Sequence, residues 1–117
     1  MDDESPWERY AARVTGLREG LDEQDRGLTE FERRLLRVLA VGEEFGRAAE
    51  AVREMVGVSS RPLRAARSWS DVRMGLCGAI TTALIALDTI SGDPVGLLND
   101  HLNQRADRAR PHRTPEP

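Results

Sequence analysis

Helix-start signals constrain the fold of this chain more than any other feature of its sequence. Ser5 with Glu8 and Thr29 with Glu32 have the spacing of a capping box. In that motif a hydroxyl and a carboxylate satisfy backbone N–H groups that a helix start leaves unpaired. Pro6 directly follows the first cap, at the position where proline suits a helix. Each signal therefore predicts the first turn of a helix.

Two more signals further along the chain bring the expected number of helices to four. Ser68 or Ser70 can cap a third helix, and Asp93 followed by Pro94 can start a fourth. The helices are expected near residues 6–24, 30–56, 69–90 and 94–108. No strand pattern or internal repeat accompanies them, so the predicted fold class is all-α, with the helices arranged as a four-helix bundle.

Apolar residues recur at helical spacing and predict which helix faces are buried. The stripe of the second helix consists of Phe31, Leu35, Val38, Phe45, Ala49, Val52 and Val56. The stripe of the third helix consists of Trp69, Val72, Leu76, Ile80, Ala83, Leu87 and Ile90. The third helix is apolar on a further side as well, so we expect it to be central.

The composition fits one domain and excludes several kinds of chemistry. We expect a single domain over residues 1–109 and a disordered, proline-rich tail over 110–117. All 17 basic residues are arginine, which excludes a Schiff-base or P-loop lysine. The single cysteine, Cys77, excludes a disulfide framework and is expected in the core. His101 and His112 are too few for a histidine-rich zinc site, and His101 is expected at the surface.

Charge and hydropathy predict a soluble, cytoplasmic protein that binds neither DNA nor a membrane. The net charge is −3, whereas DNA-binding domains are usually basic. The acidic start of the sequence is unlike a signal peptide. The longest apolar run, Cys77 to Leu87, is shorter than the about 20 residues that span a bilayer.

An acidic cluster on the second helix is the first candidate for a site. Arg47 lies three or four residues from Glu43, Glu44 and Glu50, spacings that place side chains on one side of a helix. Glu54 follows one turn later. The simplest interpretation is a solvated face held by salt bridges.

A second interpretation rests on a resemblance to a known family. The segments LLRVLAVGEEFGRAAEAV and SWSDVRMGLCGAITTALIALDTISGD, joined by a basic loop, resemble the MazG-type all-α nucleoside triphosphate pyrophosphohydrolases. The similarity covers about residues 30–109 and is greatest to short MazG-like proteins of actinobacteria and their phages. It implies assembly into dimers or tetramers. It also implies magnesium held by an EExxE motif on one helix and an ExxD motif on the next.

The chain departs from the motif that the resemblance implies. Glu43 and Glu44 match its first pair, but Arg47, Gly75 and Gly78 stand at three other acidic positions. The resemblance therefore implies no catalytic residue and no bound metal, with Glu43 and Glu44 as residual metal candidates. The glycines either leave a cavity or let another helix come close. The candidate ligand-binding residues are Glu43, Glu44, Arg47, Glu50, Gly75, Gly78 and the loop arginines Arg61 and Arg64, with Arg67 beside them.

Three hypotheses for function follow from these observations. The first is a MazG-like protein without catalysis that binds a nucleotide, another small molecule or a partner, needs no cofactor and forms a homo-oligomer. The second is a pyrophosphohydrolase with a rearranged magnesium site that converts a nucleoside triphosphate to a monophosphate and pyrophosphate. The third is a helical dimerisation module with no ligand. Under the first hypothesis, replacing Arg47, Gly75 and Gly78 with carboxylates is expected to restore metal binding.

Overall fold

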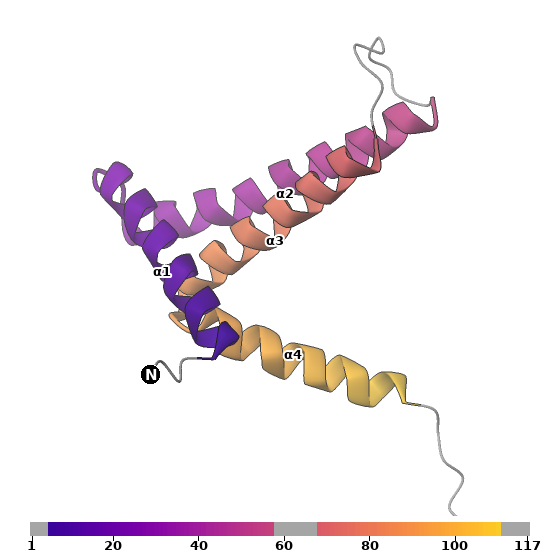
Figure 1. The fold of residues 1–117 in the computed structure, drawn as a ribbon. Coiled ribbons are helices and arrows are strands. Elements are labelled where there is room, and N and C mark those ends of the chain that lie inside the picture. The colour runs from indigo at the N-terminus through magenta and orange to yellow at the C-terminus, as the bar shows by residue number, and fades with distance from the viewer. Residues whose placement is uncertain (1–4, 58–67, 111–117) are drawn as a thin grey trace, which may run out of the picture.

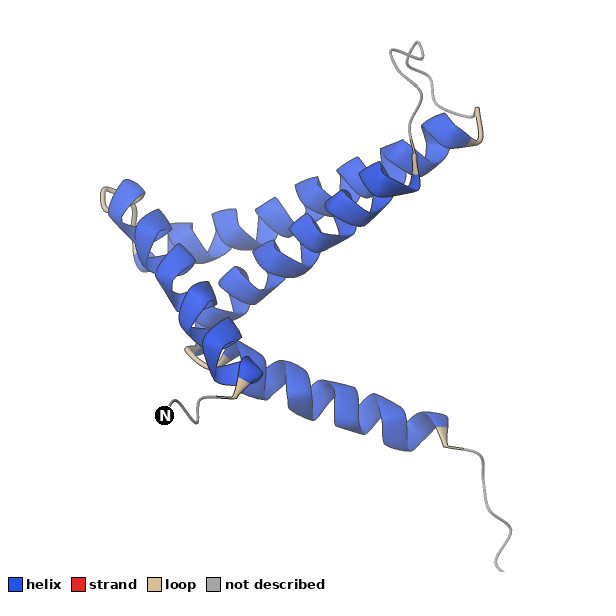
Figure 2. Ribbon diagram, viewed as in Figure 1, coloured by secondary structure: helices blue, strands red, loops and turns tan. Residues whose placement is uncertain are grey.

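The computed structural model describes residues 5–57 and 68–110 and contains four helices there, with no strand in those ranges. The helices are α1 (Pro6–Gln24), α2 (Glu30–Met55), α3 (Trp69–Ser91) and α4 (Pro94–Ala109) (Figure 2). The prediction of an all-α chain with four helices is thus confirmed, and every helix end lies within one residue of its expected position. The predicted loop arginines Arg61, Arg64 and Arg67 lie outside the described residues, as does the tail beyond Arg110.

The helices begin where the capping signals predict. The backbone N–H of Glu8 donates to the Ser5 hydroxyl at 3.2 Å, and that of Glu32 donates to the Thr29 hydroxyl at 3.1 Å. Both glutamates accept a hydrogen bond from the N–H of the cap residue in return. Ser68 takes this position before α3, since its N–H donates to the carboxylate of Asp71 at 2.8 Å. The alternative cap, Ser70, already lies inside the helix.

Helices α2 and α3 form an antiparallel hairpin, and the other two helices join it at one end (Figure 1). Helix α1 crosses the end of the hairpin that holds the start of α2 and the end of α3 (Figure 1). Helix α4 leaves from the same end and points away from the hairpin (Figure 1). Helix α3 packs against each of the other three helices, which confirms its predicted central place.

The buried core within one chain consists of few and mostly small residues. The apolar residues that are buried are Val14, Ala48, Ala51, Val72, Ile85 and Ala86. Ala48 and Ala51 form the side of α2 that meets α3, because small side chains let the two helices approach closely. The hairpin contact therefore falls mostly beside the apolar stripes, of which Val72 alone is among these buried residues.

The prediction that the two apolar stripes are buried is wrong for most of their large side chains. Phe45 on α2 is 61% exposed, and Leu76 and Ile80 on α3 are 44% and 57% exposed. The stripe of α2 lies about a quarter turn from the side that carries Ala48, so contact with α3 cannot cover it. Spacing correctly groups these residues on one face, but a single chain leaves that face open.

Two further expectations for α3 change in the structure. Cys77 is exposed, so its predicted place in the core is wrong, because it lies on the side of α3 opposite to Gly75, which contacts α2. The helix also extends beyond the apolar run at its centre. Its 23 residues are long and apolar enough, by length and composition, to cross a membrane, a test that core helices of soluble proteins also pass. His101 is exposed on α4, as predicted.

Candidate functional site

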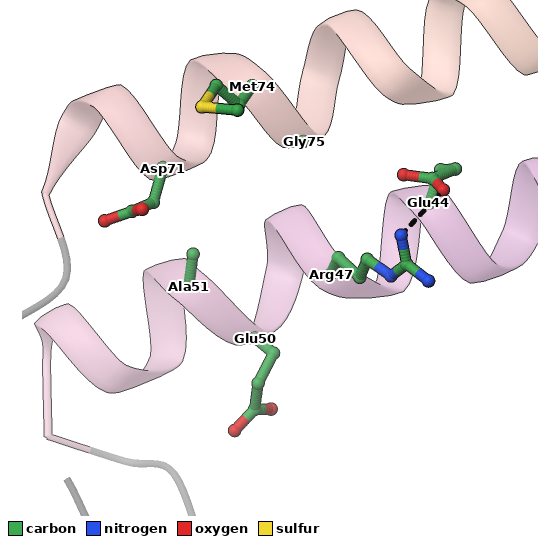
Figure 3. Close-up of a pocket in the computed structure, with 7 residues that line it drawn as sticks. All are labelled: Glu44, Arg47, Glu50, Ala51, Asp71, Met74 and Gly75. Carbon is green, nitrogen blue, oxygen red and sulfur yellow. Dashed lines mark hydrogen bonds and ion pairs between the residues drawn. The ribbon is translucent and has the colours of Figure 1, made fainter. Parts of the chain in front are cut away.

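An open pocket lies between α2 and α3 on one face of the hairpin. Its volume is about 360 Å³. The residues that line it, which we call the charged pocket, are Glu44, Arg47, Glu50, Ala51, Asp71, Met74 and Gly75 (Figure 3). Four of the residues predicted from the sequence thus come together here. Glu43 is exposed and does not line the pocket.

An ion pair within α2 neutralises one carboxylate of the charged pocket. The Arg47 guanidinium donates to Glu44 Oε1 at 2.9 Å, one helical turn away (Figure 3). Of the acidic partners that the spacing allows, the arginine therefore pairs with Glu44. The Arg47 side chain is 71% exposed, so water screens the pair, and such exposed pairs stabilise a fold by about 1 kcal/mol at most.

Gly75 lies at a point where the two helices of the hairpin approach each other closely. A Cβ atom built on this residue would lie 2.8 Å from Ala48 Cβ and 3.0 Å from Ala48 Cα. The backbone of α2 therefore occupies the place of a side chain at position 75. Of the two alternatives that the sequence left open, a cavity or a close helix contact, the structure has the close contact here.

Gly78 has different surroundings from Gly75. The three atoms nearest to its missing Cβ belong to the Glu44 side chain, whose Oε2 lies 2.7 Å from the ideal Cβ position. The carboxylate of Glu44 thus lies over the space that Gly78 leaves. Because a side-chain end can move and a helix backbone cannot, position 78 has room for a side chain and position 75 does not.

The carboxylates of the charged pocket do not converge on one point. Glu50 pairs with Arg53 at 3.7 Å and points away from α3 (Figure 3). Asp71 accepts from the backbone and hydroxyl of Ser68 at the start of α3. Within residues 5–57 and 68–110, no three His, Cys, Asp or Glu side chains are placed to hold a metal ion together. Magnesium needs several converging oxygen ligands, so these residues do not fit a magnesium site.

Asp71 is a pocket residue that the sequence analysis did not select. It lies in the first turn of α3, where an acidic side chain is explained by capping and by the helix dipole. Its spacing from Ser68 predicts that role alone. Only the pairing of α2 with α3 brings it into the same pocket as Glu50, so no local signal could have found it.

A second group of charges, also missed, lies where α1, α2 and α3 meet. The Arg18 guanidinium donates to Asp88 at 2.6 Å and also to Asp22. From α2, Arg37 donates to Asp22 at 2.6 Å and to the Thr89 hydroxyl at 3.0 Å. We call these five residues the junction cluster. The Asp88 side chain is 3% exposed and that of Arg37 is 5% exposed.

Hydrogen bonds within the junction cluster shift two pKa values. The bond to Asp88 raises the pKa of the Arg18 guanidinium above its ordinary value, against the opposing effect of burial. Burial alone would raise the pKa of Asp22, but the hydrogen bonds and charges of Arg37 and Arg18 outweigh it, so that pKa lies below the usual range. Charge pairing thus holds α1 to the hairpin, because each charge is matched by a partner from another helix.

An isolated charge inside an apolar segment is the signal that could have revealed the junction cluster. Asp88 interrupts the apolar sequence LIALDTI of α3, and Arg37 stands between Leu36 and Val38. Charged residues on a core helix are rarely buried unless they are paired. Comparison with known proteins adds no further assignment: no protein-family model, no curated protein and no solved structure matches this chain.

Proposed function

We propose that this chain is a non-catalytic binding protein: a helical scaffold that self-associates into dimers or tetramers and binds a small ligand at the charged pocket without a metal ion. The proposed fold is that of a MazG-like protein. It rests on the segments that resemble that family. The exposed thiol of Cys77 suits a reducing compartment, so the proposed location is the cytoplasm.

The ion pair between Arg47 and Glu44 is the observation that carries this proposal. The Arg47 guanidinium lies 2.9 Å from Glu44 Oε1, so it already binds a carboxylate that a divalent cation would need as a ligand. A positive charge at that distance also repels a cation, by an amount that grows as the pocket becomes drier. Once released from Glu44, the same guanidinium can instead bind two oxygens of a phosphate or carboxylate with its planar fork of N–H donors. An anionic ligand such as a nucleotide is therefore the proposed class.

The second hypothesis, hydrolysis at a rearranged magnesium site, is favoured by one observation. Glu44, Glu50 and Asp71 all line the charged pocket, so three carboxylates share one cavity even though they point apart. A rearrangement that released Glu44 from Arg47 and Asp71 from Ser68 would be required before they could share an ion.

Calorimetric titration and a pyrophosphate assay on the purified protein distinguish these proposals. The titrants are a panel of nucleoside triphosphates, each with and without magnesium. We expect binding that does not need magnesium and no release of pyrophosphate. Arg47→Met is expected to weaken that binding at least tenfold. The matched control is Arg26→Met, which should bind normally. Like Arg47, Arg26 is exposed and pairs with a glutamate, Glu23, one turn away.

Two outcomes would contradict the proposal. Magnesium-dependent release of pyrophosphate by the unmodified chain would establish the hydrolase. Absence of binding to every nucleotide, together with self-association, would favour the dimerisation module.

A further inference from the structure

The stripe of α2 has a row of large apolar side chains with no cover from its own chain. Five of its residues within the helix are between 40% and 70% exposed: Phe31, Leu35, Val38, Phe45 and Val52. Their steps of three, four and seven residues place them on one side of α2 over about six turns. A solvent-facing helix side of this length would normally be polar.

A matching row on α3 continues this surface. Trp69, Leu76 and Ile80 are exposed and share one side of the helix. Leu76 and Val72 line a shallow apolar groove together with Phe45 and Val52 of α2. The groove joins the two rows, so the hairpin has one continuous apolar surface, which we call the apolar face. The charged pocket is formed by the other sides of the same two helices.

We infer that a second copy of this chain covers the apolar face, so that two hairpins pack into a four-helix bundle about a two-fold axis. This inference rests on the self-association proposed above and names the surface that produces it. A two-fold axis requires a surface that complements itself. Two antiparallel helices with similar apolar rows meet that requirement, since each row of one copy can lie in the groove of the other.

The size of the apolar face agrees with a stable interface between two chains. The two rows contain eight large side chains, five on α2 and three on α3. Each of them exposes on the order of 100 Å². Their sum is on the order of 800 Å², which is about the area that each partner buries in a standard protein interface.

The small internal core explains why the partner that buries the apolar face should be a second copy of the chain. Apart from Pro94, only six apolar residues of the described chain are buried, and four of them are alanine or valine residues on α2 and α3. A fold with so little internal burial needs the missing apolar contacts at all times. A second copy is the one partner present whenever the chain is present, whereas a different protein would leave the hairpin open in its absence.

A lipid surface is the competing cover, and the charges of the hairpin disfavour it. Helix α3 alone is apolar enough for a membrane, but it is paired along its length with α2. If the hairpin spanned a bilayer, Glu44, Arg47 and Glu50 of α2 would enter the hydrocarbon with it. Binding to vesicles is therefore an outcome that would overturn the inference.

Measurement of molar mass by sedimentation or light scattering tests the apolar face. At about 50 µM we expect the unmodified protein to be a dimer or a multiple of one. Phe45→Glu and Leu76→Glu should each raise the dissociation constant at least tenfold. Leu36→Glu is the matched control, because Leu36 is similarly exposed but lies on another side of α2, and it should leave the mass unchanged.

A cysteine scan keeps the test decisive where a glutamate variant fails to fold. In a Cys77→Ala background, single cysteines at positions 45, 52, 76 and 80 are oxidised. At least one position is expected to give a covalent dimer, because residues near a two-fold axis meet their own copies. The control, a cysteine at position 36, should give none.

The contrary results separate this inference from the proposed function. A monomer at 50 µM would overturn both the apolar face and the self-association. An assembly that resists Phe45→Glu and Leu76→Glu, or that cross-links through position 36 alone, would overturn the apolar face only. Monomers that cosediment with phosphatidylcholine vesicles would place a lipid surface on the face instead.

Discussion

Gly75 and Gly78 lie one turn apart on α3, and their different surroundings lead to opposite predictions for the same substitution. In Gly75→Ala the new methyl group would lie 2.8 Å from Ala48 Cβ, with the α2 backbone directly behind it. We expect a loss of about 1–3 kcal/mol in the free energy of unfolding, as for other overpacked contacts. In Gly78→Ala only the mobile end of Glu44 must move, and the gain in helix propensity is up to about 1 kcal/mol.

Urea denaturation of the two variants at equal protein concentration measures this difference. Gly78→Ala serves as the control for any general effect of alanine in α3. Equal stability of both variants would mean that the close contact at Gly75 is not rigid.

The contact at Gly75 also changes how a metal site could be rebuilt in this scaffold. On the sequence alone, carboxylates at positions 47, 75 and 78 together are expected to restore metal binding. The structure shows that position 75 lacks the space. We therefore expect the double variant Arg47→Glu with Gly78→Asp to bind Mn²⁺ more tightly than the triple variant that adds Gly75→Glu.

Electron paramagnetic resonance of added Mn²⁺, with circular dichroism to confirm helicity, compares the two variants. The double variant removes the positive charge beside Glu44 and adds two carboxylates around it. Tighter binding by a folded triple variant would show that α2 and α3 separate easily.

At the scale of the helices, the junction cluster is expected to make α1 sensitive to the charge of one residue. Asp22 accepts hydrogen bonds from both Arg18 and Arg37, which belong to different helices. We expect Asp22→Asn to lower the free energy of unfolding by about 2 kcal/mol at neutral pH, as for lost hydrogen bonds to charged groups. Glu23→Gln is the matched control, since Glu23 is exposed and pairs only with exposed Arg26, and should change stability by less than about 0.5 kcal/mol.

The lowered pKa of Asp22 gives this effect a defined pH dependence. Its pKa in the folded state is below the unfolded-state value of about 3.9. The stabilisation is therefore present above that value and is lost as the pH falls further, through the folded-state pKa. Urea titrations at several pH values should show the gap between the unmodified chain and Asp22→Asn closing below about pH 4. A gap independent of pH would mean that the carboxylate's charge is not what stabilises the junction.

The sequence predicted the helices well because capping and periodicity are local. Ser5, Thr29 and Asp93 all cap a helix as expected, since each bond joins residues three positions apart. The place of Cys77 and the direction in which the Phe45 side of α2 faces depend on which sides of two helices meet. That choice is made by Ala48 and Gly75, which are small and carry no periodic signal.

The candidate site was predictable only where its residues belong to one helix. Spacing brought Glu44 and Arg47 together correctly, because they are one turn apart on α2. Asp71 and the partners of Asp88 come from other parts of the chain and required the packing itself.

For the whole molecule, the exposed apolar face couples folding to assembly. If two copies must meet to bury it, unfolding and dissociation are linked, and mass action then makes the melting temperature depend on concentration. We expect a hundredfold increase in protein concentration to raise the melting temperature measurably for the unmodified chain and for Leu36→Glu. The weakly associating Phe45→Glu variant should show a smaller rise. A melting temperature independent of concentration for the unmodified chain would indicate a self-sufficient monomer.

The hairpin carries its apolar face and its charged pocket on different sides of the same two helices. A two-fold axis through the apolar face would turn the two charged pockets outward, away from each other. Such a pair is bivalent: it offers two equivalent sites at a fixed separation. A ligand that repeats its anionic group along a chain could then engage both sites, with an avidity that exceeds the affinity of either one.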